Sequence, residues 1–247
     1  MARLTRQQDA FGQEIWDHFN GREACEIVER DDGDIAVSGG PAAYFGPFDQ
    51  WPQFERDAIE LAAGRVLDIG CGAGRVGLHL QSRGLKVTGI DNSPLAVKVC
   101  KARGLTDTRL LTAAQVSRKL GTFDTIMMYG NNFGLMENFR RARWLLRRFH
   151  AMTGPRACIL AGTLDPYDTK DPLHLSYHRF NRRRGRWPGQ ARIRIRYKRL
   201  ATPWFDYLLV SRSEMKRIVA GTGWRLARTF DSKGPVYVAV LEKEIGS

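Results

Sequence analysis

The residues best suited to chemistry in this sequence lie between positions 66 and 75, which read VLDIGCGAGR. A short apolar run that starts at Val66 contains one acid, Asp68. Three glycines then follow at alternating positions: Gly70, Gly72 and Gly74. Because glycine has no Cβ atom, such a loop can turn sharply and can approach a ligand closely. A buried strand that leads through a loop of this kind into a helix predicts a site for a nucleotide-like group in a doubly wound sheet.

The spacing of the loop argues against a dinucleotide or an ATP-type ligand. The fingerprint Gly-x-Gly-x-x-Gly would need a glycine at Arg75, and no Gly-x-x-x-x-Gly-Lys-Ser/Thr run occurs in the sequence. The segment Lys86–Asp91 predicts a second strand that ends in an acid, and a carboxylate there can accept both hydroxyls of a ribose. Ser93 and Pro94 then supply a helix N-cap and a first-turn proline.

These two segments, VLDIGCGAG at 66–74 and GIDNSP at 89–94, resemble the first and second motifs of the class I S-adenosylmethionine (SAM)-dependent methyltransferases. The likeness covers roughly residues 51–164, and the closing strands more loosely. It implies an α/β fold, doubly wound on a mostly parallel seven-stranded sheet. It also implies SAM as cofactor, S-adenosylhomocysteine (SAH) as product, and methyl transfer by in-line displacement. The alternative is an α/β fold whose glycine loop is only a tight turn.

The resemblance also implies which residues would hold the cofactor. They lie in the glycine loop, after the second and third strands, at the end of the fourth strand and just ahead of the core: Asp68, Gly70, Cys71, Gly72, Gly74, Asp91, Asn92, Ser93, Ala113, Ala114, Gln115, Tyr129, Tyr44 and Trp51. The segment 111–115 lacks the aspartate that many relatives place beside the adenine. Tyr44 and Trp51 would either close over the cofactor or simply pack the N-terminal segment.

The acceptor side is marked by amides and histidines. The fourth strand would end in YGNNFG at 129–134, which is not the Asp/Asn-Pro-Pro-Tyr/Phe motif of many enzymes that methylate base amino groups. Asn131 and Asn132 would orient a polar acceptor, or would only cap the loop. His174 and His178 would line a lid, and either could act as a general base. Their spacing matches no recognised metal site, so we expect no metal.

Composition narrows the class of protein. The chain of 247 residues is long enough for one domain with an insertion, and its four cysteines are scattered without a C-x-x-C motif. The first residues lack the apolar core of a signal peptide, and no apolar run approaches the length of a membrane span. We therefore expect a cytoplasmic enzyme that does not bind membranes.

The order of apolar and polar residues predicts the elements that position these groups. We expect an N-terminal cap segment over 1–50 and a SAM-binding domain over 51–247, with a β-ribbon lid inserted at about 164–210. Helices are predicted at 4–19, 53–63, 138–152 and from 211, and a hairpin around 31–33. Further strands are predicted at 109–112, 123–129, 157–162, 224–230 and 236–241, the last one antiparallel.

The formal net charge of +13 is concentrated in the insertion. Residues 164–200 contain eleven Lys or Arg against three Asp, and basic residues alternate with apolar ones from Arg192 to Lys198. This period of two predicts a strand with one basic face. A lid over a small-molecule acceptor is the leading interpretation. The alternatives are a solvated charged face, an RNA or DNA track along 179–199, and a SAM-binding protein without catalysis.

Overall fold

The computed structural model describes residues 2–244, which fall into two compact units. Unit 1 consists of residues up to Trp51, Ala63–Val116 and Arg192–Phe205. Unit 2 consists of Pro52–Ala62, Ser117–Ala191 and the residues from Asp206 onward. The predicted boundary between residues 50 and 51 stays a prediction.

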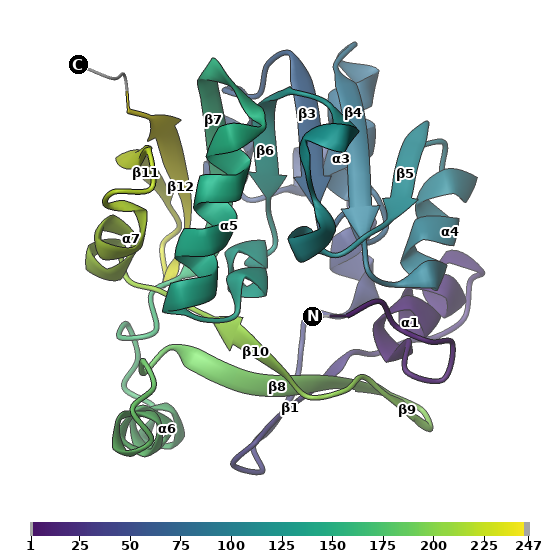
Figure 1. The fold of residues 1–247 in the computed structure, drawn as a ribbon. Coiled ribbons are helices and arrows are strands. Elements are labelled where there is room, and N and C mark those ends of the chain that lie inside the picture. Colours follow the sequence, from purple (N-terminus) through teal and green to yellow (C-terminus); the bar gives the residue numbers. More distant parts are fainter. Residues whose placement is uncertain (1, 245–247) are drawn as a thin grey trace. The chain divides into compact units, whose positions relative to one another are not determined.

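The main sheet has seven strands in the order β11-β12-β7-β6-β3-β4-β5 (Figure 1). Its members are β3 (Arg65–Ile69), β4 (Lys86–Asp91), β5 (Asp107–Leu110), β6 (Phe123–Met128), β7 (Thr153–Leu164), β11 (Trp224–Asp231) and β12 (Val236–Lys243). In unit 1, β4 pairs in parallel with β3 and β5. In unit 2, β7 pairs in parallel with β6, and β12 pairs antiparallel with β7 and β11. The predicted α/β fold, with its antiparallel strand at 236–241, is confirmed.

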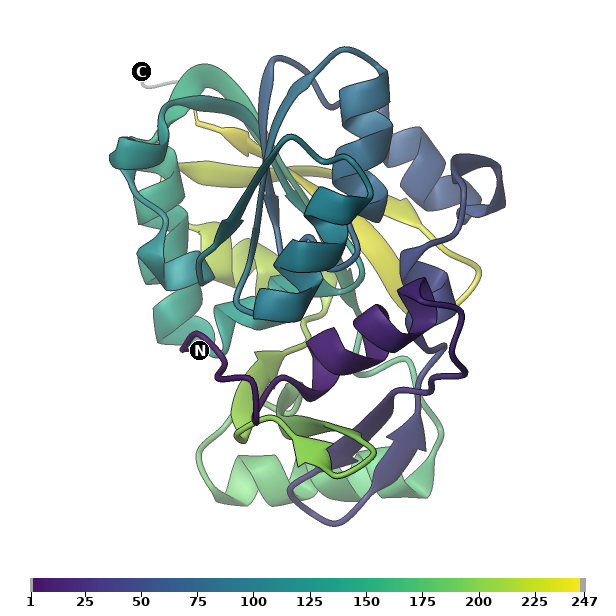
Figure 2. The same cartoon turned by 90° about the vertical axis from the view of Figure 1, so that its right-hand side faces the viewer.

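The helices of unit 1 pack on strands whose apolar residues are fully buried. Helix α3 (Arg75–Ser82) follows the glycine loop, and α4 (Pro94–Ala102) begins as predicted, because the Ser93 hydroxyl accepts a hydrogen bond from the Ala96 amide at 3.0 Å. Helix α1 (Ala10–Phe19) packs against α4 (Figure 2). It begins later than the predicted residue 4, because the Asp9 side chain caps it at the Gly12 amide.

A second, smaller sheet joins the N-terminal segment to the insertion. The predicted hairpin is present as β1 (Ile27–Arg30) and β2 (Ile35–Val37). Strand β8 (Gln190–Tyr197) pairs antiparallel with β1, a pairing that the sequence did not suggest. As predicted, β8 exposes Arg192 and Arg196 and buries Ile195 and Tyr197. Strand β9 (Leu200–Ala201) pairs with β8, and the sheet order is β10-β8-β1-β2, with β10 at Phe205–Leu208.

Helices of unit 2 differ from the prediction mainly in their ends. Helix α5 (Phe139–Ala151) is capped by Asn138 and begins one residue later than predicted, and it buries Leu145, Leu146 and Phe149. Helix α2 (Gln53–Ile59) stops four residues before the predicted end, and α6 (Pro172–Arg183) was not predicted. Within residues 2–244, no helix is both long and apolar enough to cross a membrane.

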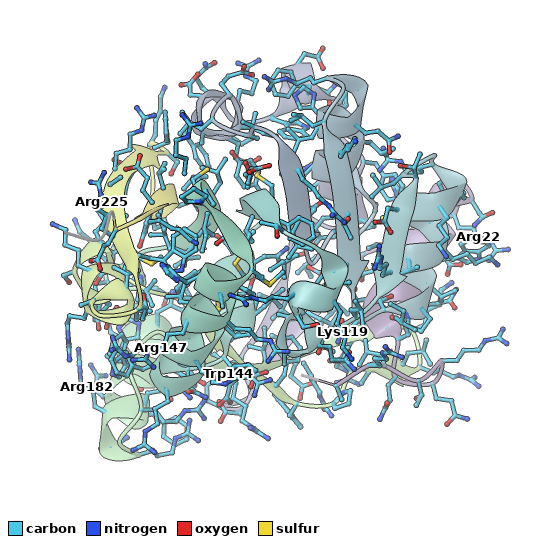
Figure 3. The ribbon with its side chains drawn as sticks, turned by 45° about the horizontal axis from the view of Figure 1, so that its top comes forward. Arg22, Lys119, Trp144, Arg147, Arg182 and Arg225 are labelled. Atoms are coloured by element: carbon cyan, nitrogen blue, oxygen red, sulfur yellow. The ribbon has the colours of Figure 1, made fainter. Side chains whose placement is uncertain are left out.

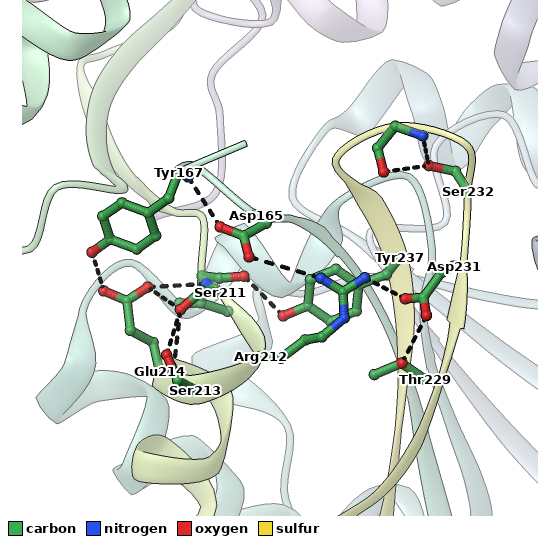
Figure 4. Close-up of polar contacts among 12 residues, drawn as sticks. Asp165, Tyr167, Ser211, Arg212, Ser213, Glu214, Thr229, Asp231, Ser232 and Tyr237 are labelled. Carbon is green, nitrogen blue, oxygen red and sulfur yellow. Dashed lines mark hydrogen bonds and ion pairs between the residues drawn. The ribbon is translucent and has the colours of Figure 1, made fainter. Parts of the chain in front are cut away.

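Helix α7 (Arg212–Val219) ties the two ends of the insertion to the sheet (Figure 4). The predicted capping box is present, because the Ser211 hydroxyl accepts from the Glu214 amide while the Glu214 carboxylate accepts from the Ser211 amide at 3.0 Å. The other Glu214 oxygen accepts from the Tyr167 hydroxyl at 2.6 Å. Arg212 lies between Asp165 and Asp231 and pairs with both.

The capping box gives a direct test of this local structure. Replacing Ser211 with Ala removes the oxygen that satisfies the Glu214 amide, and a lost N-cap of this kind costs about 1 kcal/mol. We expect the free energy of unfolding, measured by urea titration, to fall by about that amount. Ser211→Thr keeps a capping hydroxyl and serves as the control. Equal losses in the two variants would contradict a capping role.

Candidate functional site

The glycine loop of unit 1 connects β3 to α3 and can be built only from residues that tolerate positive φ. Gly70, Gly72 and Gly74 have φ of +72°, +55° and +84°, a region that side chains with a Cβ rarely adopt. The amides of Gly70 and Cys71 both donate to the carbonyl of Ile90, at 2.9 and 3.0 Å. The loop is therefore fastened to the carboxyl end of β4.

The structure brings the two predicted acids of unit 1 together with this loop. The Asp91 carboxylate accepts from the amides of Gly72 at 3.0 Å and Ser93 at 2.9 Å. Burial nevertheless raises the pKa of Asp91 to about 6. Burial and the charge of Asp91 raise the pKa of Asp68 to about 7, and its Oδ2 has no hydrogen-bond partner in the described part of the chain. Burial therefore raises the pKa of both carboxyl groups, even though backbone amides donate to Asp91.

Cys71 has a packing environment rather than a reactive one. Its Sγ lies 3.6 Å from the Sγ of Cys100 on α4, and the Cys100 thiol donates to the Gly72 carbonyl at 3.1 Å. The contact with Cys100 and burial raise the pKa of Cys71 well above its ordinary value. Since the thiolate is the nucleophilic form, Cys71 is inert in this state and shapes the loop.

The remaining cofactor candidates of unit 1 lie around the same loop with their side chains largely engaged. Asn92 donates through Nδ2 to the Ala2 carbonyl at 3.0 Å. Gln115 accepts from the Thr112 amide at 3.1 Å, so its side chain closes the short turn Ala113–Gln115. Ala113 and Ala114 in this turn are half-buried, and Gln115 is exposed.

The two aromatic candidates behave differently. Trp51 is buried, donates to the Gly46 carbonyl at 2.9 Å and lies under the Arg75 guanidinium, 4.1 Å from the ring centre. These contacts favour the packing interpretation for Trp51. Tyr44 is half-buried and donates its hydroxyl to Glu26.

Helix α1 packs against the glycine loop, a contact that the sequence did not predict. The Phe11 ring reaches within 3.8 Å of the position that a Cβ on Gly72 would occupy, and it meets the Tyr44 ring edge-on at 5.5 Å between centres. Asp9 holds the helix in place by accepting from the Leu95 amide at 3.1 Å. The only sequence signal for this contact is the amphipathic face of the helix that carries Phe11.

In unit 2, the end of β6 carries the acceptor candidates. Tyr129 is buried and donates to the Glu55 carbonyl at 2.9 Å. Asn131 has φ of +63°, and its buried Oδ1 has no hydrogen-bond partner within residues 2–244. Asn132 begins a short 3₁₀ helix, Asn132–Met136. An unpaired buried amide oxygen is the kind of group that a ligand donor would satisfy.

Tyr207 is a further residue of this loop that sequence reasoning missed. Its hydroxyl donates to the Asn131 carbonyl at 2.6 Å. Its ring lies so close to Gly134 that a Cβ there would stand 2.3 Å from it. Sequence reasoning placed Tyr207 only within the insertion, because nothing in the sequence linked β10 to the end of β6.

The two histidines contact their own insertion. His174 is exposed, with Nδ1 3.4 Å from the Thr169 hydroxyl. His178 is buried and meets the Tyr167 ring edge-on at 5.7 Å between centres. Residues 2–244 contain no group of three or more His, Cys, Asp or Glu that could hold a metal ion.

Comparison with known proteins agrees with this geometry. The family model described as "Methyltransferase domain" matches residues 66–155, which include the glycine loop and Asp91. A crystal structure of a SAM-dependent methyltransferase from Bacteroides fragilis, in complex with SAH, covers 99% of this chain and 98% of its own, with a TM-score of 0.84 and 27% identity. These comparisons support a SAM-dependent methyltransferase with the class I fold.

Curated relatives match this methyltransferase over shorter stretches. The putative methyltransferase YqeM of Bacillus subtilis is 31% identical over 78 residues, or 32% of this chain and 31% of the relative. The ubiquinone biosynthesis O-methyltransferase of Pseudomonas aeruginosa is 29% identical over 111 residues, or 42% of this chain and 46% of the relative. The chain thus spans less than half the length of these curated relatives.

The raised pKa values of Asp68 and Asp91 predict a pH-dependent stability. A carboxyl group whose folded pKa exceeds its unfolded value stabilises the fold at low pH, and this stability is lost as the pH rises through the folded pKa. For Asp68, whose pKa rises from the ordinary 3.8 to about 7, we expect the free energy of unfolding to fall between about pH 4 and pH 7. Urea titrations across this range should show a shallower decline in Asp68→Asn. An unchanged slope would show that Asp68 is ionised throughout.

Proposed function

We propose that this methyltransferase moves a methyl group from SAM to a small-molecule acceptor. The observation that carries the proposal is the Asp91 carboxylate at the end of β4, which meets the amide of Gly72 in a loop with three left-handed glycines. The first motif and the second motif thus form one site in unit 1. The SAH-bound Bacteroides fragilis structure, which aligns over nearly the whole chain, supports the same ligand here.

The residues present fit such a cofactor. Asp91 would accept the ribose hydroxyls, and the orphaned Oδ2 of Asp68 offers an acceptor beside the loop. The amides of the glycine loop can approach the amino acid end because no Cβ intervenes. SAM supplies an activated methyl group, so the protein's part is to hold the acceptor in line and to exclude water. Such alignment can lower a barrier by about 7–11 kcal/mol.

A small molecule fits the insertion better than a nucleic acid, because many of its basic groups already have acidic partners. Glu29 pairs with Arg194 at 2.9 Å and with Arg196 at 3.1 Å. Other pairs join Arg186 to Asp206 and Lys198 to Asp17. Basic side chains also come from many elements, as the labelled Arg22, Lys119, Arg147, Arg182 and Arg225 show (Figure 3). A phosphate track would need a row of cations that remain available.

Asp91 gives the sharpest test of cofactor binding. In Asp91→Asn, the ribose loses a charged acceptor, which is worth about 1.5–3 kcal/mol, so SAH affinity measured by calorimetry should fall at least about tenfold. Since the pKa of Asp91 is about 6, wild-type affinity should rise between about pH 5 and pH 7.5 as the carboxylate ionises, and the variant should lose this rise.

Asp107→Asn is the matched control for this experiment. Asp107 begins β5 in the same unit and pairs with Arg109, at the opposite end of its strand from the loop. Its SAH affinity should equal that of the wild type. Equal affinity in Asp91→Asn and wild type would remove Asp91 from the ribose role.

Turnover separates an enzyme from a SAM-binding protein. We expect methyl-labelled SAM, incubated with the protein and a cell extract split into small-molecule and RNA fractions, to label a compound in the small-molecule fraction. Asp91→Asn is the control for background labelling. Label in RNA alone would contradict a small-molecule acceptor, and no label despite measured SAH binding would favour the non-catalytic alternative.

A further inference from the structure

Helix α1 carries a buried acid that the structure leaves without a donor. Glu14 is fully buried, and apart from the carboxyl group of Glu26 no N–H or O–H group among residues 2–244 is a partner for its oxygens. A buried carboxyl group in this situation costs several kcal/mol if it is ionised, so it calls for an explanation.

The other buried acids beside Glu14 on this segment are fully supplied with donors. Asp9 accepts from the amides of Gly12 and Leu95. Asp17 accepts from Arg22, Tyr197 and Lys198, at 2.9, 3.0 and 2.6 Å. Hydrogen-bond donors from elsewhere in the chain therefore stabilise both Asp9 and Asp17 in their buried positions. Glu14 is the exception.

The group that faces Glu14 is a second carboxyl group. Glu26, just before β1, is 4% exposed and accepts from the hydroxyls of Ser38 at 2.5 Å and Tyr44 at 3.1 Å. Burial raises the pKa of Glu14 to about 11, and the charge of Glu26, a hydrogen bond between the two carboxyl groups and the charge of Cys25 act in the same direction. No basic group is among the causes of this shift, so Glu14 holds a proton at neutral pH.

This acidic pair adjoins the glycine loop within unit 1. Phe11, three residues before Glu14 on α1, shares its side of the helix and contacts both the loop at Gly72 and the Tyr44 ring. Tyr44 in turn contacts Glu26. The aromatic pair Phe11 and Tyr44 thus lies between the glycine loop and the acidic pair Glu14 and Glu26, and contacts both.

We propose that Glu14 and Glu26 form the subsite that binds a cationic amine of the methyl acceptor. The inference rests on the proposed function and names the chemical class of its substrate. An ammonium group brings two or three N–H donors and one positive charge, which is what two facing carboxyl groups lack. When it binds, Glu14 loses its proton to solvent and the Glu14 carboxylate accepts an N–H of the amine.

The test uses n-butylammonium as the probe and n-butanol as its neutral analogue, each titrated calorimetrically into the SAH-loaded protein. We expect the ammonium to bind more tightly than the alcohol. Titration in buffers of different ionisation enthalpy should show proton release on binding. In Glu14→Gln, proton release should vanish and ammonium affinity should fall at least about tenfold, with SAH affinity unchanged.

Glu29→Gln is the matched control, because Glu29 is a carboxylate of the adjoining β1 that Arg194 and Arg196 already neutralise. It should bind the ammonium like the wild type. Glu26→Gln provides a second variant of the pair if Glu14→Gln does not fold. Equal affinity for the ammonium and the alcohol, or ammonium affinity that neither Gln variant alters, would overturn the proposal.

A loss of SAH affinity in Glu14→Gln would also overturn it, since the acid would then serve the cofactor. A wild-type protein that does not bind SAH would instead refute the proposed function.

Discussion

The site depends on the burial of two acids, Asp68 and Asp91, next to the glycine loop. Asp68 is the residue before the end of β3 and Asp91 is the last residue of the neighbouring parallel strand β4, and both are buried. The glycine loop turns back on itself and presents the Gly72 amide to Asp91. That one hydrogen bond requires φ of +55° at Gly72, which fixes the residue type there. The remaining electrostatic cost is visible as a raised pKa in both acids.

Burying these carboxyl groups costs free energy in the free protein. A ligand that donates hydrogen bonds to them would reduce this cost. Hydroxyl or amino groups from a bound molecule would supply what the backbone does not, and binding would then stabilise the fold. The unpaired Oδ1 of Asn131 in unit 2 is the same kind of feature on a neutral group. Local departures from full hydrogen bonding are expected at functional sites rather than in the core.

The features that were predicted best from the sequence are those that depend on neighbouring residues only. The strand-loop-helix of the first motif, the Ser93 cap with Pro94 and the Ser211–Glu214 capping box each depend on a few neighbouring positions, and the structure confirms their placement. The sequence did not predict the pairing of β1 with β8, because a register such as Val28 opposite Ile195 depends on tertiary contacts. Helix α6 was not predicted, although Asp171 and Pro172 form its N-cap and first-turn proline.

The same distinction applies to charge. Composition marked the insertion as basic, and from that alone a surface for phosphates was a reasonable hypothesis. The structure shows that several of its cations neutralise acids of the N-terminal segment, such as Lys198 with Asp17 and Arg194 with Glu29. Part of the basic charge of the insertion is therefore paired with acids of the N-terminal segment. The net charge of the insertion alone overstates the positive charge that is available to a ligand. The informative charges are those without a counterpart, and a sequence cannot show them, because pairing is decided by contacts between segments far apart in the chain.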